Sequence, residues 1–192
     1  MKIASLPVLW AIAALSHAND GRYYVGIDAF FGNGEETTEI GREESSDEAD
    51  HRGRAFTLGY RYPDNDRFEI ELTKITSEFD DGRKEEFEGI DFSWSLGILP
   101  QPSMQPYVEV GFGLYEYQES DVLTEDNEDL TGLALHVGLG AIYEISPRLE
   151  LDASYRVKHI GWEGTSEDED DDDNIMMSEE IAKLVFGLRF IF

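Results

Sequence analysis

The last eleven residues of the chain alternate between two kinds of side chain. Every even position from Ala182 to Phe192 is apolar, whereas the odd positions include Lys183, Gly187 and Arg189. Side chains of a β-strand point to opposite faces with a period of two residues. The segment therefore predicts a strand with one face suited to hydrocarbon and one suited to a wetter interior, as in a strand that crosses a membrane.

The start of the chain has the features of a secretory signal peptide. Lys2 precedes an apolar stretch, residues 3–15, which is followed by a small-residue pattern that ends at Ala18. We expect cleavage after Ala18, which assigns residues 1–18 to the signal peptide and 19–192 to the mature domain, with an uncleaved anchor as the alternative. No later segment reaches the ~20 apolar residues of a membrane-spanning helix. A mature chain that lies in a membrane must then be a closed barrel, because only a barrel satisfies all backbone groups without helices.

Eight segments of the chain have the period of two that strands require. They are residues 21–31, 54–62, 67–77, 87–99, 107–117, 131–144, 149–162 and 180–192. In each segment one phase holds an apolar set that contains no charge: it lies on the odd-numbered residues of the first, sixth and seventh segments and on the even-numbered residues of the others. This phase is assigned to lipid. Arg54, Lys74 and Glu116 share the outward phase only beyond these sets, near the outer rim, where a long side chain can reach the headgroups. The pattern predicts an all-β fold, an eight-stranded antiparallel up-and-down transmembrane β-barrel.

The opposite phase carries charges of both signs. Buried charges persist only when they are paired and hydrogen-bonded, so we predict an ion-pair network inside the barrel. Its predicted members are Asp28, Arg61, Glu69, Glu71, Asp91, Glu109, Asp152, Arg156, Lys158, Lys183 and Arg189. Arg67, Glu144 and Glu150 share the same phase. Because eight strands leave a lumen just wide enough for side chains to fill, we expect a plugged interior and not a channel.

The connections between the segments alternate in length. The short ones are residues 63–66, 100–106 and 145–148, and the long ones are 32–53, 78–86, 118–130 and 163–179. Bacterial outer-membrane barrels have short periplasmic turns and long external loops, so both termini are expected in the periplasm. The four long connections and their flanks contain 30 of the 42 acidic residues but few basic ones, so the predicted external surface is strongly acidic.

These features resemble the small outer-membrane β-barrel proteins of Gram-negative bacteria, namely the OmpA-type transmembrane domain, OmpX and the opacity proteins. The resemblance covers the whole mature chain, and it lies in architecture more than in sequence. It implies that Leu188, Phe190 and Phe192 form the signal that the barrel-assembly machinery reads. It also implies that outer-membrane lipid and lipopolysaccharide are partners.

Composition limits the other partners. A net charge of −27 opposes binding to nucleic acid, and the absence of cysteine excludes thiolate chemistry. The acidic run at residues 167–174 offers oxygen ligands but lacks the glycine turn and terminal glutamate of an EF-hand, so it is interpreted as a solvated block. We expect no cofactor and no specific metal site. Divalent cations and extracellular ligands at the loops stay open as partners.

Two alternatives to a structural and surface-interaction role remain open. Some barrels of this kind are lipid A deacylases or acyltransferases, and the deacylases resemble one another in a His-x-Ser pattern late in the barrel. The corresponding tripeptide here begins at His159 and contains no serine. His136 faces inward, but the sequence alone pairs it with none of the inward serines, Ser93, Ser95 and Ser154. A narrow porin is the other alternative. We therefore expect a protein that is not an enzyme.

Overall fold

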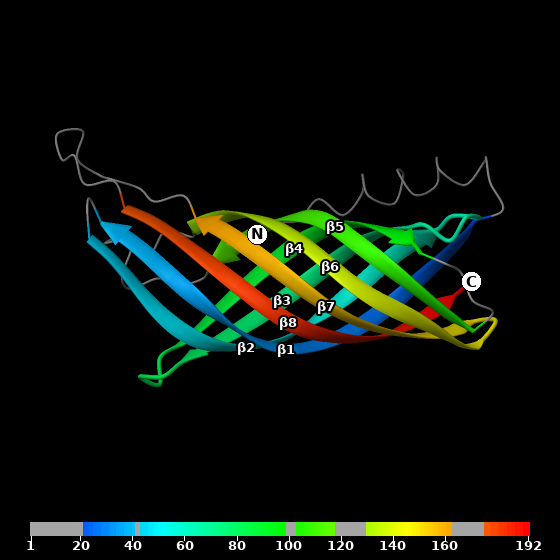
Figure 1. Cartoon of the computed structure of the whole chain (residues 1–192), viewed down its shortest axis with the longest axis horizontal. Coiled ribbons are helices and arrows are strands. Elements are labelled where there is room, and N and C mark those ends of the chain that lie inside the picture. The colour runs from blue at the N-terminus through cyan, green and yellow to red at the C-terminus, as the bar shows by residue number, and fades with distance from the viewer. Residues whose placement is uncertain (1–20, 41–42, 99–102, 118–129, 163–174) are drawn as a thin grey trace, which may run out of the picture.

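The computed structural model describes residues 21–40, 43–98, 103–117, 130–162 and 175–192. Eight antiparallel strands form a closed barrel in which each strand pairs with its sequence neighbours and β8 pairs with β1 (Figure 1). The strands are β1 (Arg22–Ile40), β2 (Glu43–Arg61), β3 (Arg67–Phe79), β4 (Lys84–Gly97), β5 (Met104–Tyr117), β6 (Leu130–Ser146), β7 (Leu149–Trp162) and β8 (Ile175–Ile191). The predicted fold class is confirmed. In these residues no helix is long and apolar enough to cross a membrane.

The alternation read from the sequence decides which side chains face outward. Every exposed large apolar side chain lies on the predicted apolar phase or, at Met104 and Ile145, continues it beyond the predicted ends of the segment. Phe186 is 52% exposed, whereas the neighbouring inward residue Val185 is 3% exposed. The outer wall is therefore an apolar belt, which is the surface that hydrocarbon requires.

The prediction that residues 32–53 form a connection without strands is wrong. β1 continues past Phe31 to Ile40, and β2 begins at Glu43, so the two strands stay paired as a long hairpin. In the same way, β8 begins at Ile175, five residues before the predicted start. The physical reason is that backbone pairing continues after the apolar alternation ends, because side chains beyond the membrane can be polar on both faces.

The two ends of the barrel differ. One end carries Phe192 and the turns that follow β2 and β6, whereas the opposite end carries the β1–β2 hairpin and the turn between β3 and β4 (Figure 1). Aromatic rings surround part of the first end: Tyr23 lies 4.9 Å from Tyr60 and 6.5 Å from Phe192 between ring centroids. We call the first end the turn end and the second the hairpin end.

Candidate functional site in the barrel lumen and at its hairpin end

The turn end of the lumen is closed by two arginines that share one carboxylate. Arg61 Nη1 and Arg67 Nη2 each lie 2.7 Å from an oxygen of Glu150. Arg67 and Glu150 are both 1% exposed. Arg61 also donates two hydrogen bonds to Oδ1 of Asn65, a residue of the turn after β2. The ion pairs thus fasten this turn across the opening of the barrel.

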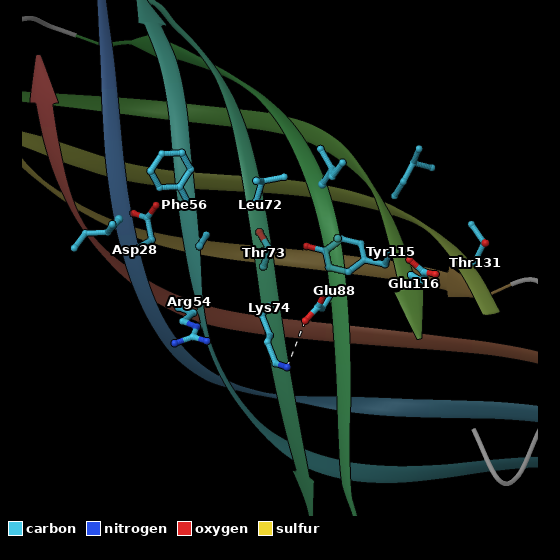
Figure 2. Close-up of a pocket in the computed structure, with 15 residues that line it drawn as sticks. Asp28, Arg54, Phe56, Leu72, Thr73, Lys74, Glu88, Tyr115, Glu116 and Thr131 are labelled. Atoms are coloured by element: carbon cyan, nitrogen blue, oxygen red, sulfur yellow. Dashed lines mark ion pairs between the residues drawn. The ribbon is translucent and has the colours of Figure 1, made fainter. Parts of the chain in front are cut away.

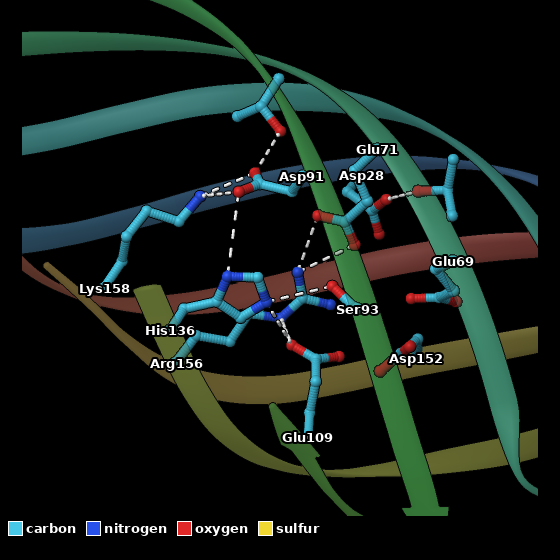
Figure 3. Close-up of polar contacts among 12 residues, drawn as sticks. Asp28, Glu69, Glu71, Asp91, Ser93, Glu109, His136, Asp152, Arg156 and Lys158 are labelled. Atoms are coloured by element: carbon cyan, nitrogen blue, oxygen red, sulfur yellow. Dashed lines mark hydrogen bonds and ion pairs between the residues drawn. The ribbon is translucent and has the colours of Figure 1, made fainter. Parts of the chain in front are cut away.

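Arg156 of β7 lies at the centre of the lumen between two carboxylates. Its Nη1 is 2.8 Å from Glu71 Oε2 on β3, and its Nε is 3.0 Å from Glu109 Oε1 on β5 (Figure 3). All three side chains are nearly inaccessible to solvent. The guanidinium therefore links strands that are not neighbours in the sheet, by ion pairs and by hydrogen bonds to Glu71, in an interior where an unpaired charge is costly.

A second arginine, Arg189 of β8, makes three ion pairs. Its guanidinium nitrogens lie 2.6 Å from Asp28, 3.4 Å from Glu69 and 3.5 Å from Asp152. Each of these carboxylates also accepts a hydrogen bond from a hydroxyl group. The donors are Thr57, Tyr24 and Tyr107, respectively. This satisfies the carboxylates without water, as a dry interior requires.

Lys158 of β7 pairs with Asp91 of β4. Its Nζ lies 2.8 Å from Asp91 Oδ1 and 2.7 Å from Asp91 Oδ2 (Figure 3). The Oδ2 atom also accepts hydrogen bonds from the hydroxyl groups of Tyr115 and Thr73. Lys183 differs from the prediction: among the described residues it makes no ion pair within 4 Å, and its ammonium lies 4.1 Å from the ring centroid of Phe30. Glu144 also differs, because it lies beside a β-bulge at the end of β6 and is exposed.

The inward glycines relieve crowding around these charged groups. A Cβ atom at Gly59 would collide with the ring of Tyr24, and one at Gly187 would collide with the carboxylate of Asp28. The interior is therefore too crowded at these two positions for a larger residue. This is consistent with a lumen filled by side chains.

An apolar layer, which the sequence analysis did not predict, lies on the hairpin side of the charged network. The ring centroid of Phe87 lies 5.1 Å from that of Tyr117 and 5.3 Å from that of Trp162, and Tyr117 lies 5.5 Å from Trp162. Ile75 and Ile160 join the same buried cluster. These residues occupy the inward phase of β3, β4, β5 and β7, so they form a second barrier across the lumen.

Three buried glutamates lie beyond this layer, where the hairpin end opens. Glu36, Glu85 and Glu179 are at most 8% exposed, and Arg83 of the β3–β4 turn forms ion pairs with the first two. Arg83 Nη1 lies 2.5 Å from Glu85 and 3.5 Å from Glu36. Burial, together with the charge of Glu85, raises the pKa of Glu36 to about 7. Glu36 is five residues beyond Phe31, the last apolar outward residue of β1.

Glu179 is the most enclosed of the three. It accepts a hydrogen bond of 3.1 Å from Ser77 Oγ and lies 3.5 Å from His51 Nδ1. Burial, with the nearby charge of Glu36, raises its pKa well above the ordinary value for a glutamate. The sequence does not predict these acids as inward residues, because they lie in segments whose pattern predicts connections, 32–53, 78–86 and 163–179.

The structure brings together one serine and one histidine. Ser93 Oγ lies 3.0 Å from His136 Nε2, and His136 Nδ1 is 3.8 Å from Asp91 (Figure 3). This order of groups resembles that of a nucleophile, its base and an orienting acid. However, Ser93 is 1% exposed, His136 is 3% exposed and Asp91 is already paired with Lys158, so substrate has no access to the serine in this packing.

The predicted assembly signal lies on the outer wall of β8. Leu188, Phe190 and Phe192 are 39%, 48% and 66% exposed. The amide of Phe192 donates a 3.0 Å hydrogen bond to the carbonyl of Tyr23, at the seam where β8 meets β1. The three side chains therefore form one apolar row at the strand that closes the barrel.

Two of the earlier predictions fall outside the described residues: the signal peptide at 1–18 and the acidic run at 167–174. Within the described part of the chain, no group of three or more His, Cys, Asp or Glu side chains is arranged to hold a metal ion.

Comparison with known proteins identifies relatives of this barrel. The family model "Outer membrane protein beta-barrel domain" matches residues 3–190. Neisserial surface protein A is similar in structure, with a TM-score of 0.57 and 22% identity over 88% of this chain and 97% of that chain. OprG from Pseudomonas aeruginosa (TM-score 0.47, 14% identity, 92% and 97% covered) and Ail from Yersinia pestis with a heparin analogue (0.45, 14%, 88% and 99%) are more distant. No curated protein sequence matches the chain.

Proposed function

The chain belongs to the outer-membrane β-barrel domain family, and from this premise we propose that it is a surface-interaction protein whose barrel is a scaffold for acidic external segments. The outer membrane is its location. Function in such scaffolds is carried by the segments that the barrel presents and not by the fold itself.

The filled lumen is the observation that carries this proposal. Arg156, Arg189 and Lys158 each bind carboxylates across the interior, and the rings of Phe87 and Trp162 add an apolar barrier. A lumen occupied in this way leaves its two ends as the surfaces that partners can reach. The hairpin end projects beyond the apolar belt, because β1 continues past Phe31 to Ile40 and stays paired there with β2.

We place the hairpin end outside the cell and both termini in the periplasm. The support is the pattern of the family, in which short turns are periplasmic and long segments are external. The absence of cysteine makes the orientation simple to test. Ser46→Cys, on the exposed hairpin, should react with a membrane-impermeant maleimide on intact cells, and Pro147→Cys, in the turn after β6, should react only after lysis. The opposite labelling would refute the orientation.

The hairpin presents carboxylates to the partner. Glu48 and Asp50 are exposed on β2 and have no ion pair among the described residues. We propose that they attract a cationic partner, since complementary charge accelerates and orients encounters.

The test of this role uses the purified protein in lipid nanodiscs and fluorescent polylysine as the probe, at physiological salt. The double variant Glu48→Gln with Asp50→Asn should weaken binding severalfold. The matched control, Asp64→Asn with Glu144→Gln at the turn end, removes the same charge and should leave binding unchanged. Equal loss in both variants would mean that only the net charge matters and would contradict a role for the hairpin.

An enzyme is the second candidate, and the contact between Ser93 and His136 favours it. We rank it below the scaffold because both groups are buried among paired charges.

We also propose the barrel-assembly machinery as a partner. It would recognise the apolar row of Leu188, Phe190 and Phe192.

A further inference from the structure

The outer wall of the barrel has a hollow of about 970 Å³ next to the hairpin end (Figure 2). Its lining residues come from β1 to β6. The floor of the hollow is a row of residues that are register partners on successive strands, so that each residue pairs with the next one across the sheet. The members of this row turn their side chains inward and leave backbone on the outside: Asp28, Ala55, Thr73, Gly89 and Tyr115.

Two outward rows of opposite character border the hollow. The row on the membrane side is apolar and consists of Ile27, Phe56, Leu72, Ile90 and Leu114. The row on the hairpin side is polar and consists of Arg54, Lys74, Glu88, Glu116 and Thr131. Figure 2 shows Phe56 and Leu72 on one side of the hollow and Arg54, Lys74 and Glu88 on the other. The hollow therefore lies across the boundary where a lipid changes from acyl chain to headgroup.

The charges of the polar row are not all compensated. Lys74 is neutralised by Glu86 at 2.7 Å and Glu88 at 3.4 Å. Arg54 is exposed and has no ion pair or side-chain hydrogen bond with any described residue. It therefore presents a free guanidinium at the polar edge of an apolar hollow. A guanidinium binds a phosphate group through two parallel hydrogen bonds.

We propose that this hollow, which we call the β2 wall site, binds lipid A of the outer leaflet, with a lipid A phosphate on Arg54 and acyl chains along Ile27, Phe56 and Leu72. The inference rests on the proposed orientation, which places the hairpin end in that leaflet. At the usual strand spacing the hollow is roughly 20 Å wide, which suits a lipid with several acyl chains more than one with two.

The acidic side chains of the polar row do not prevent a phosphate group from binding at Arg54. Glu116 lies three strands from Arg54, roughly 15 Å away at the spacing of paired strands. This exceeds the screening length of about 8 Å at physiological ionic strength. Glu88 is nearer, but its charge is shared with Lys74.

The experiment measures lipid retention by native mass spectrometry of the detergent-solubilised protein. The probes are purified lipid A and phosphatidylglycerol, which also offers a phosphate but has two acyl chains. We expect lipid A to be retained preferentially, Arg54→Gln to lower its retention about tenfold, and Arg54→Lys to restore most of it. Arg148→Gln at the turn end removes the same charge and should have no effect. Heat-modifiable gel migration verifies that each variant is folded.

Three outcomes would overturn the inference. They are retention of lipid A by Arg54→Gln at the level of the unaltered protein, an equal loss in Arg148→Gln, and equal, Arg54-dependent retention of phosphatidylglycerol. None of these readouts depends on cell-surface topology or on the polylysine probe, so failure here is distinguishable from failure of the proposed function.

Discussion

Arg156 and Glu71 form an ion pair across the lumen, from β7 to β3, in which Nη1 of Arg156 lies 2.9 and 2.8 Å from the two carboxylate oxygens. Neither partner is exposed by more than 2%. The pair connects strands that share no backbone hydrogen bonds. It therefore ties opposite sides of the barrel together.

Breaking this pair should destabilise the barrel. Arg156→Met leaves the Glu71 and Glu109 carboxylates buried without their cation, so we expect a loss of about 3–5 kcal/mol in the free energy of unfolding. The control is Lys84→Met, which breaks an exposed pair with Glu78 and should cost less than about 1 kcal/mol. Urea unfolding in lipid vesicles measures both. Equal losses would mean that the lumen is wet.

A charge on the outer wall should be costly in the apolar belt. Phe186→Arg places a guanidinium among lipid-facing side chains and should lower stability by about 2–4 kcal/mol. Glu180→Arg, on the same face of β8 but beyond the belt, should cost about 0–1 kcal/mol. The same unfolding assay compares them. No loss for Phe186→Arg would show that this face of β8 does not meet lipid.

The hairpin end should loosen as pH rises. The pKa of Glu36 is about 7 in the folded protein, against 4.5 for an ordinary glutamate, so the folded state favours the protonated form. Stability is therefore full below about pH 4.5 and falls as the pH rises through about 7, where Glu36 and Glu85 repel each other.

Hydrogen exchange of the β1 and β2 amides around Glu36 measures this effect. Exchange should accelerate between pH 5 and 8 beyond its intrinsic pH dependence. Glu36→Gln should remove most of the excess, while Glu48→Gln, an exposed change on the same hairpin, should not. If the pH dependence of exchange in Glu36→Gln equalled that of the unaltered protein, the effect would belong to a group other than Glu36.

The contact between Ser93 and His136 should be structural. Because Ser93 is buried, we expect a fluorophosphonate probe to leave the folded protein unlabelled, and lipid A from expressing cells to keep its acyl chains. Mass spectrometry measures both. A lost or added acyl chain that disappears in Ser93→Ala would instead establish an enzyme.

The sequence was sufficient to predict which side chains face outward, but not where the strands end. Lipid demands apolar side chains at alternate positions, so the phases of β5, β6 and β8 could be read directly. Past Phe31 this demand ends, and polar residues of β1 pair without a hydrophobic signature. The hairpin was therefore read as a connection, and its inward acid Glu36 was missed.

The lumen, too, could be predicted from the sequence only in part. Inward charge at Arg156 and Glu71 could be inferred from phase, whereas their pairing depends on the register of β3 against β7 across the barrel. The contact between Ser93 and His136 also depends on strand register. Ser93 of β4 and His136 of β6 both pair with Gly111 of β5, which lies between them. A single sequence does not fix such distances. The apolar cluster around Trp162 was overlooked because inward apolar residues look like interruptions of the charged phase.

Side chains fill the lumen from Glu150 to Trp162, so the barrel should not conduct ions. Single-channel recording in planar lipid bilayers measures this conduction. We predict that the refolded protein inserts without sustained openings at physiological salt. Stable, reproducible openings from the unaltered protein would contradict a filled lumen, because ions cannot pass through an interior that these charges and rings occupy.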